Sequence, residues 1–61
     1  MTFTWRNPAG EDGPAFDGVI PALLDAVRVH TGETQGWALA VITWDHSMKE
    51  RGWSLHEVRN A

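Results

Sequence analysis

The 61-residue chain contains no cysteine and few basic residues. Without cysteine it can form no disulfide, no thiolate zinc site and no thiol-based active site, and such a composition suits a reducing compartment, so we expect a cytoplasmic protein. Five Lys/Arg against eight Asp/Glu give a net charge of -3. Because binding to nucleic acid depends on basic side chains that neutralise phosphates, we expect no direct contact with nucleic acid.

Long apolar runs are also absent. The longest run, 37–42, is far shorter than the roughly 18 residues that a membrane-spanning helix needs. Residues 1–6 lack the basic segment followed by an apolar one that marks a signal peptide. We therefore predict no membrane association. The chain is too short for two cores, so we predict one domain over 1–61, with an extended or loop segment at 1–16 and a compact core at 17–61.

Patterns that carry catalysis or bind metals are missing as well. The glycines and hydroxyl side chains are scattered, and none forms a nucleophile elbow or a phosphate-binding loop. His46 and Glu50 are one helical turn apart, but a metal site needs at least three protein ligands, and only His30 or His56 could complete one. We interpret the pair as a solvated polar face. The chain is therefore predicted not to be an enzyme and to hold no cofactor or metal.

The first half of the chain has two clear patterns. Phe3 and Trp5 alternate with threonines, which predicts a strand over 2–6, and a turn-rich loop follows at 7–14. The next apolar residues recur at helical spacing and predict a helix over 18–30, with Asp17 as N-cap and Gly32 as its end.

The segment 35–51 supports two interpretations. On a helix, Trp37, Val41, Trp44 and Met48 form one apolar stripe, and Gly52 provides the C-terminal stop. The stretch 41–44, by contrast, has strand propensity. We favour the helix and keep the strand as the alternative.

The C-terminal segment, 53–60, also supports either a helix or a strand, depending on which of the two holds for 35–51. Ser54 and Glu57 fit a capping box preceded by Trp53 as a hydrophobic staple, which predicts a helix over 55–60. The resulting fold is mainly α, a small helical domain with an extended N-terminal segment and helices at about 18–30, 35–51 and 55–60. The alternative is an α+β fold of order β-α-β-β, with strands at about 2–6, 37–44 and 53–59.

Acidic side chains are concentrated in residues 1–36. That half of the chain has five acidic residues and two arginines, which gives it a net charge of -3. Such a surface suits a basic protein partner, and tryptophan is typical of interface anchors. The predicted partner-binding residues are the five acids and two tryptophans near chain turns or ends: Glu11, Asp12, Asp17, Asp25, Glu33, Trp5 and Trp53.

These features predict a non-enzymatic acidic protein–protein interaction module that binds a partner with a basic surface, such as a nucleic-acid-handling complex. By analogy of size and charge alone, it is similar to phage- or mobile-element-encoded inhibitors of the anti-CRISPR kind. The alternative is a small regulatory subunit or homo-oligomer that associates through the tryptophan-bearing stripe, and either function is compatible with a monomer or a homodimer. Residues 49–58 are similar to the entrance of a helix-turn-helix unit, which makes a DNA reader a third hypothesis that the acidic charge disfavours.

Overall fold

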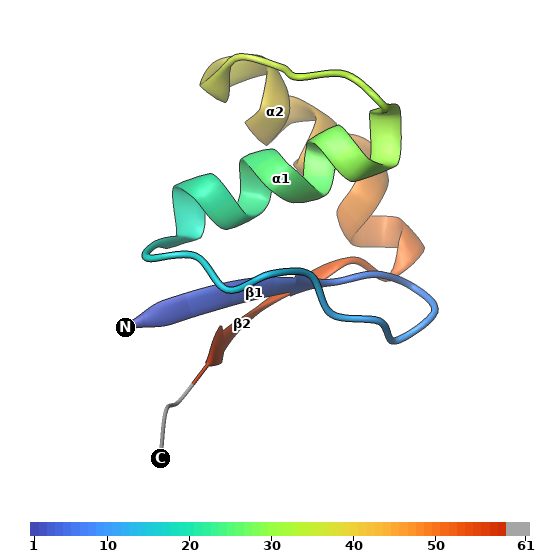
Figure 1. Ribbon diagram of the computed structural model, residues 1–61. Helices are drawn as coiled ribbons and strands as arrows, with labels where there is room; N and C mark the ends of the chain where they lie inside the picture. Colours follow the sequence, from blue (N-terminus) through green and yellow to red (C-terminus); the bar gives the residue numbers. More distant parts are fainter. Residues whose placement is uncertain (59–61) are drawn as a thin grey trace.

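The computed structural model describes residues 1–58 and combines two strands with a largely helical middle (Figure 1). In order along the chain, the elements are β1 (Thr2–Arg6), α1 (Val19–Thr31), α2 (Trp37–Thr43), the π-helical turn η1 (Trp44–Met48), the 3-10 turn η2 (Lys49–Arg51) and β2 (Ser54–Val58). α1 packs on β1, and α2 packs on α1 at the side away from the strands. The fold is therefore mixed α+β.

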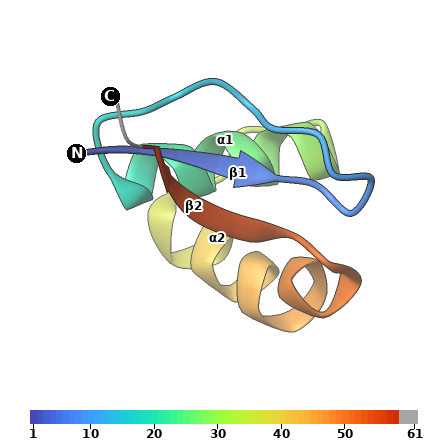
Figure 2. The same cartoon turned by 90° about the horizontal axis from the view of Figure 1, so that it is seen from below.

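The two strands come from opposite ends of the described chain and pair in antiparallel fashion, with Thr4 opposite His56. The loop between β1 and α1 runs back along the other side of β1 (Figure 2). There Phe3 and Phe16 exchange both backbone hydrogen bonds, at 2.7 and 2.8 Å. β1 is thus hydrogen-bonded on both sides, which satisfies the backbone groups that a lone strand would expose.

Gly13 allows this loop to approach β1 closely. Its N–H donates to the Trp5 carbonyl at 2.9 Å, and its own carbonyl accepts from the hydroxyl of buried Thr4 at 2.7 Å. A Cβ at position 13 would overlap the Trp5 indole ring. Only glycine therefore fits where the loop crosses the indole.

The predicted helix at 18–30 is confirmed as α1 (Val19–Thr31), and Gly32 ends it in the left-handed conformation at φ 80°. The N-cap prediction was wrong, because Gly18 occupies the cap and no side chain hydrogen-bonds there. Pro21 lies in the first turn, where its missing N–H removes no helical hydrogen bond.

The predicted helix at 35–51 is confirmed as a continuous run of α2, η1 and η2, so the alternative strand at 37–44 was wrong. The Ser47 hydroxyl donates to the Thr43 carbonyl at 2.9 Å, and the Lys49 N–H reaches back five residues to the Trp44 carbonyl. A side chain that competes for a helix carbonyl locally widens the turn. The π turn keeps both Trp44 and Met48 on the buried side.

The predicted helix at 55–60 was wrong, and the mainly α class is corrected with it. Ser54–Val58 is the strand β2, as the alternative fold predicted for 53–59; Arg59 and Asn60 lie outside the described residues. Its partner is β1, so the order is β-α-α-β. In a strand, Trp53 and Leu55 lie on the same side, and both pack on the core. The free energy gained by burying these two side chains outweighs the local preference of Ser54 and Glu57 for a helical capping box.

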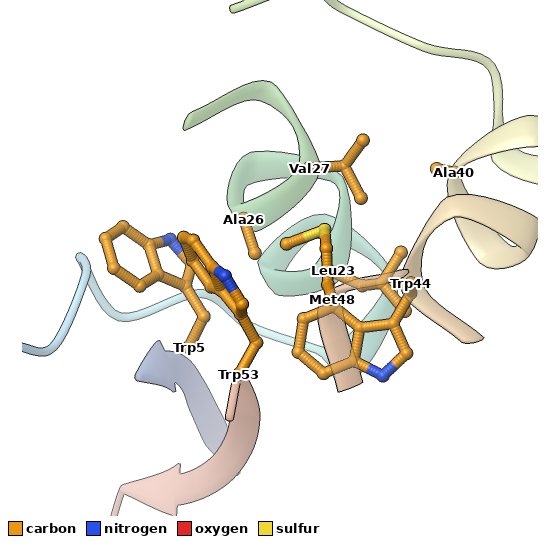
Figure 3. Close-up of a cluster of buried hydrophobic side chains, with 8 residues drawn as sticks. All are labelled: Trp5, Leu23, Ala26, Val27, Ala40, Trp44, Met48 and Trp53. Atoms are coloured by element: carbon orange, nitrogen blue, oxygen red, sulfur yellow. The ribbon is translucent and has the colours of Figure 1, made fainter. Parts of the chain in front are cut away.

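The core lies between the strands and the helices (Figure 3). Trp5 and Trp53 contact each other with ring centroids 5.3 Å apart at 52°, a tilted arrangement that aromatic rings favour. The rings of His30 and Trp53 are in a T-shaped arrangement, with centroids 5.7 Å apart and planes at 73°. Three of the eight residues in the buried cluster are tryptophans, whose large side chains compensate for the small number of residues a chain of this length can bury. The buried cluster is Trp5, Leu23, Ala26, Val27, Ala40, Trp44, Met48 and Trp53.

Candidate protein-binding surface

α2 is apolar on every side. Each of its residues except Thr43 is apolar, and the segment carries no charge. Successive helical residues turn by about 100°, so Ala38 and Ile42 lie opposite Ala40, the one residue of α2 that is buried. A helix that is apolar all round is ordinarily enclosed on all sides. Within residues 1–58, α2 is buried only on the side that packs on α1.

The side of α2 that α1 leaves uncovered carries several large apolar side chains. Trp37 is 45% exposed, Leu39 54% and Ile42 55%, and the smaller Ala38 between them is exposed too. We call these four residues the exposed face of α2. Exposed apolar residues that are grouped on one element mark interaction sites in soluble proteins more often than scattered single ones do.

The side of α2 opposite its exposed face is fixed by packing against the core. Ala40 lies next to Val27 of α1 (Figure 3), and Trp44 and Met48, which follow α2, are buried in the core. At its other end the Thr43 hydroxyl donates to the Gln35 side chain at 2.9 Å, which ties α2 to the segment that leads into it. A contact surface on a rigid element loses little conformational entropy when it binds.

The stripe predicted as a contact surface is divided by the structure. Trp44 and Met48 are 8% and 0% exposed and belong to the chain's own core, whereas Trp37 stays half exposed. Sequence reasoning missed Leu39 and Ile42, which lie off the stripe. The signal for them was the absence of any charged residue in 37–43, because a partly exposed helix of a monomer ordinarily carries charge on its outer side.

Two of the five predicted acidic residues are paired with arginine. Asp12 accepts from Arg6 at 2.7 Å at the end of β1, and this hydrogen bond lowers the pKa of the Asp12 carboxyl. Asp25 accepts from Arg28 at 2.9 Å on α1 and from the Trp5 indole N–H at 2.8 Å. Both charges are compensated locally, so they contribute less to attracting a basic partner than free carboxylates would.

Asp25 is largely covered, with 15% of its side chain exposed. Burial acts to raise its pKa, but the hydrogen bonds from the Trp5 indole and from Arg28, with the charge of Arg28, outweigh it. The pKa of the Asp25 carboxyl therefore lies below its ordinary value of 3.8. The carboxylate serves the fold by satisfying the one polar atom of a buried indole.

The other three predicted acids, Glu11, Asp17 and Glu33, are exposed. Asp17 precedes α1 and Glu33 follows it, so a helix about 20 Å long separates them. Glu11 lies in the β1–α1 loop, where its side chain accepts from Asn7 at 3.2 Å. The structure thus distributes these charges along the molecule and does not bring all five acids together.

The two tryptophans predicted as interface anchors are in the core. Trp5 is 7% and Trp53 8% exposed, so each indole contacts its own chain over nearly all of its surface. The tryptophan with a large exposed area is Trp37. Trp37 on α2 is therefore the tryptophan that is available to anchor a partner.

A second polar cluster lies on the strands. The Ser54 hydroxyl and the His56 Nε2 are 2.8 Å apart, and Arg6, opposite Ser54 in the register, binds Asp12. Among residues 1–58, no three His, Cys, Asp or Glu side chains are grouped closely enough to hold a metal ion. His46 and Glu50 therefore have no third ligand within the described part of the chain.

No family model, curated protein or solved structure matches this chain. Within residues 1–58, the helices are too short, or insufficiently apolar, to cross a bilayer.

Proposed function

We propose that this chain is a non-enzymatic protein–protein interaction module whose contact surface is the exposed face of α2. The observation that carries the proposal is a helix without charge that is buried at Ala40 and exposed at Trp37, Leu39 and Ile42. Removing apolar area from water yields about 25 cal/mol per Å², so these side chains favour any partner that covers them.

The composition of the face agrees with that of known interfaces. Interface centres are depleted in charge and enriched in aromatic residues, and energetically dominant positions are often tryptophan. Here the same uncharged helix carries one half-exposed indole, Trp37, and two exposed aliphatic side chains, Leu39 and Ile42. The surface is small, so the expected complexes are weak to moderate in affinity.

The acidic residues support a second candidate function. Glu11, Asp17 and Glu33 are exposed, and the chain has a net charge of -3. These charges would steer the module toward a basic protein surface in the cytoplasm, and in the strongest form they would block a nucleic-acid-binding surface as an inhibitor of the anti-CRISPR kind does. In this candidate the exposed face of α2 adds contact area rather than selectivity.

Site-specific photo-cross-linking tests the first function. A benzophenone side chain is placed at Leu39, and at Glu50 as an exposed control on the neighbouring turn, and each protein is irradiated in lysate of its native host. We expect discrete adducts from position 39, suppressed when Ile42→Glu is added, and few from position 50. Equal adduct patterns from the two positions would contradict the assignment of the surface to α2.

A further inference from the structure

We infer that the Ser54 hydroxyl is an acylation site, at which a small activated ester transfers its acyl group to Ser54 Oγ while His56 accepts the hydroxyl proton. The inference is independent of the exposed face of α2, because both residues lie on β2. It follows from the hydrogen bond between the two side chains, from their position on the sheet and from the charges beside them.

Ser54 and His56 have the geometry of a nucleophile beside its base. Ser54 Oγ and His56 Nε2 are 2.8 Å apart, within the range of about 2.6–3.2 Å that is typical of such pairs. In the imidazole tautomer that carries its proton on Nδ1, the hydroxyl donates to Nε2, so the proton has an acceptor when Oγ attacks. Thr4 and Ser47, by contrast, donate to backbone carbonyls. Among residues 1–58, Ser54 is the one residue whose hydroxyl is bonded to an imidazole.

The pair lies on the outer side of the sheet, where a reagent can reach it. Leu55, between the two residues, packs on the core, and successive strand residues point to opposite sides, so Ser54 and His56 point away from the core. Both residues are partly exposed. Each is paired with a residue of β1, which fixes the backbone beneath them. A nucleophile and a base on one paired strand keep their separation without reorganisation.

The charges beside the pair favour an uncharged acyl donor. The pKa of the Asp12 carboxyl is lowered mainly by the hydrogen bond from Arg6 and to a smaller extent by the charge of His56, so Asp12 and His56 are within electrostatic reach. The Asp12 carboxylate therefore favours the imidazolium that forms when His56 takes the proton. The same carboxylate and the net charge of -3 repel phosphate esters, whereas a neutral ester approaches without repulsion.

The transfer requires no co-reactant beyond the ester. Ser54 Oγ attacks the carbonyl carbon and forms the new C–O bond, and His56 Nε2 takes the hydroxyl proton. The tetrahedral intermediate then expels the leaving group with the electron pair of the broken C–O bond. A phenolate leaves as an anion without a proton from the protein, and the imidazolium releases its proton to water. Each chain takes up one acyl group, so the step is a modification and not turnover.

Reaction with p-nitrophenyl acetate tests the inference on the full chain at about pH 8, where histidine side chains are ordinarily neutral. Absorbance follows the release of p-nitrophenolate, and mass spectrometry of peptides locates the acetyl group. We expect one acetyl group per chain, on Ser54. His56→Gln should slow acetylation of Ser54 at least about tenfold, because a general base contributes on the order of 10²-fold or more. Ser54→Ala should remove the rapid release of p-nitrophenolate.

His46→Gln and Thr34→Ala are the matched controls, since they remove an exposed imidazole and an exposed hydroxyl from other segments. Both should be acetylated on Ser54 at the wild-type rate, and circular dichroism confirms that each variant is folded. An acetyl group on Lys49 or on the N-terminal amine, with none on Ser54, would overturn the inference in the wild-type chain itself. Acetylation of Ser54 that His56→Gln leaves at the wild-type rate would overturn it too, as would rapid release that persists in Ser54→Ala.

Discussion

At the scale of single residues, Asp25 connects the helical layer to the strands. Its carboxylate accepts from the Trp5 indole at 2.8 Å and from Arg28 at 2.9 Å. A buried indole N–H without an acceptor would cost about 1–3 kcal/mol, so this residue of α1 stabilises a tryptophan of β1. The charge that sequence reasoning assigned to a partner is thus engaged within the fold.

Asp25→Asn should lower the free energy of unfolding by about 1–2 kcal/mol at pH 7, because the amide oxygen still accepts from Trp5 but the charge-assisted bond from Arg28 is lost. The folded-state pKa of Asp25 lies below its ordinary value of 3.8. Its contribution is therefore complete above that value and is lost as the pH falls through the lower, folded-state pKa. Denaturant unfolding from pH 7 down to about pH 2 should show the wild type and variant converging in stability.

Asp45→Asn is the matched control, since it removes the same charge from an exposed position on η1. We expect it to change the stability by less than about 0.5 kcal/mol. A difference between Asp25→Asn and the wild type that persists at the lowest pH would show that the carboxylate's charge is not the source of the effect.

At the scale of elements, the β1–α1 loop hydrogen-bonds to β1 on the side opposite β2, much as a third strand would. Phe16 of the loop exchanges two hydrogen bonds with Phe3, the Gly13 N–H donates to the Trp5 carbonyl, and the loop crosses the Trp5 indole at Gly13. The loop therefore covers the side of β1 that β2 leaves open. Regular strand propensity would not predict this, because the loop is rich in glycine and proline.

Gly13→Ala should destabilise the domain by about 1–3 kcal/mol, because the added methyl group overlaps the Trp5 indole and forces the loop away from β1. Gly36→Ala serves as the control, since nothing lies within 4 Å of a Cβ there and the backbone φ of -66° suits alanine. Thermal unfolding followed by near-ultraviolet circular dichroism of the tryptophans measures both. Equal melting temperatures for the two variants would contradict the close packing of loop and indole.

At the scale of the whole molecule, the exposed acids predicted to bind a partner and the exposed face of α2 lie on different segments of the chain. The exposed acids Glu11, Asp17 and Glu33 lie in the β1–α1 loop and beyond the two ends of α1, whereas the exposed face of α2 is uncharged. Screening by salt weakens interactions between exposed charges and leaves apolar contacts intact or strengthened. The two candidate modes of binding therefore respond differently to ionic strength.

Association through α2 should change less than about threefold in affinity between about 0.05 M and about 1 M NaCl. It should also survive the charge reversals Glu11→Lys, Asp17→Lys and Glu33→Lys made together, which avoid the arginine-paired Asp12 and Asp25. Pull-down of any partner cross-linked through position 39 measures this. Loss of binding in high salt and in the triple variant would favour the acidic surface as the contact site.

Periodicity in the sequence alone predicted the strand at 2–6 and the helix at α1, because each has a clear local pattern followed by turn-forming residues, and it favoured helix over strand for 37–51. Tertiary structure decided the state of Ser54–Val58: a local capping signal competed with pairing to a strand at the opposite end of the described chain, and the pairing buried Trp53. It also decided which residues of α2 are exposed. A helix that is apolar all round has no polar side to orient it, so only its packing on α1 made Ala40 part of the core and left Leu39 and Ile42 exposed.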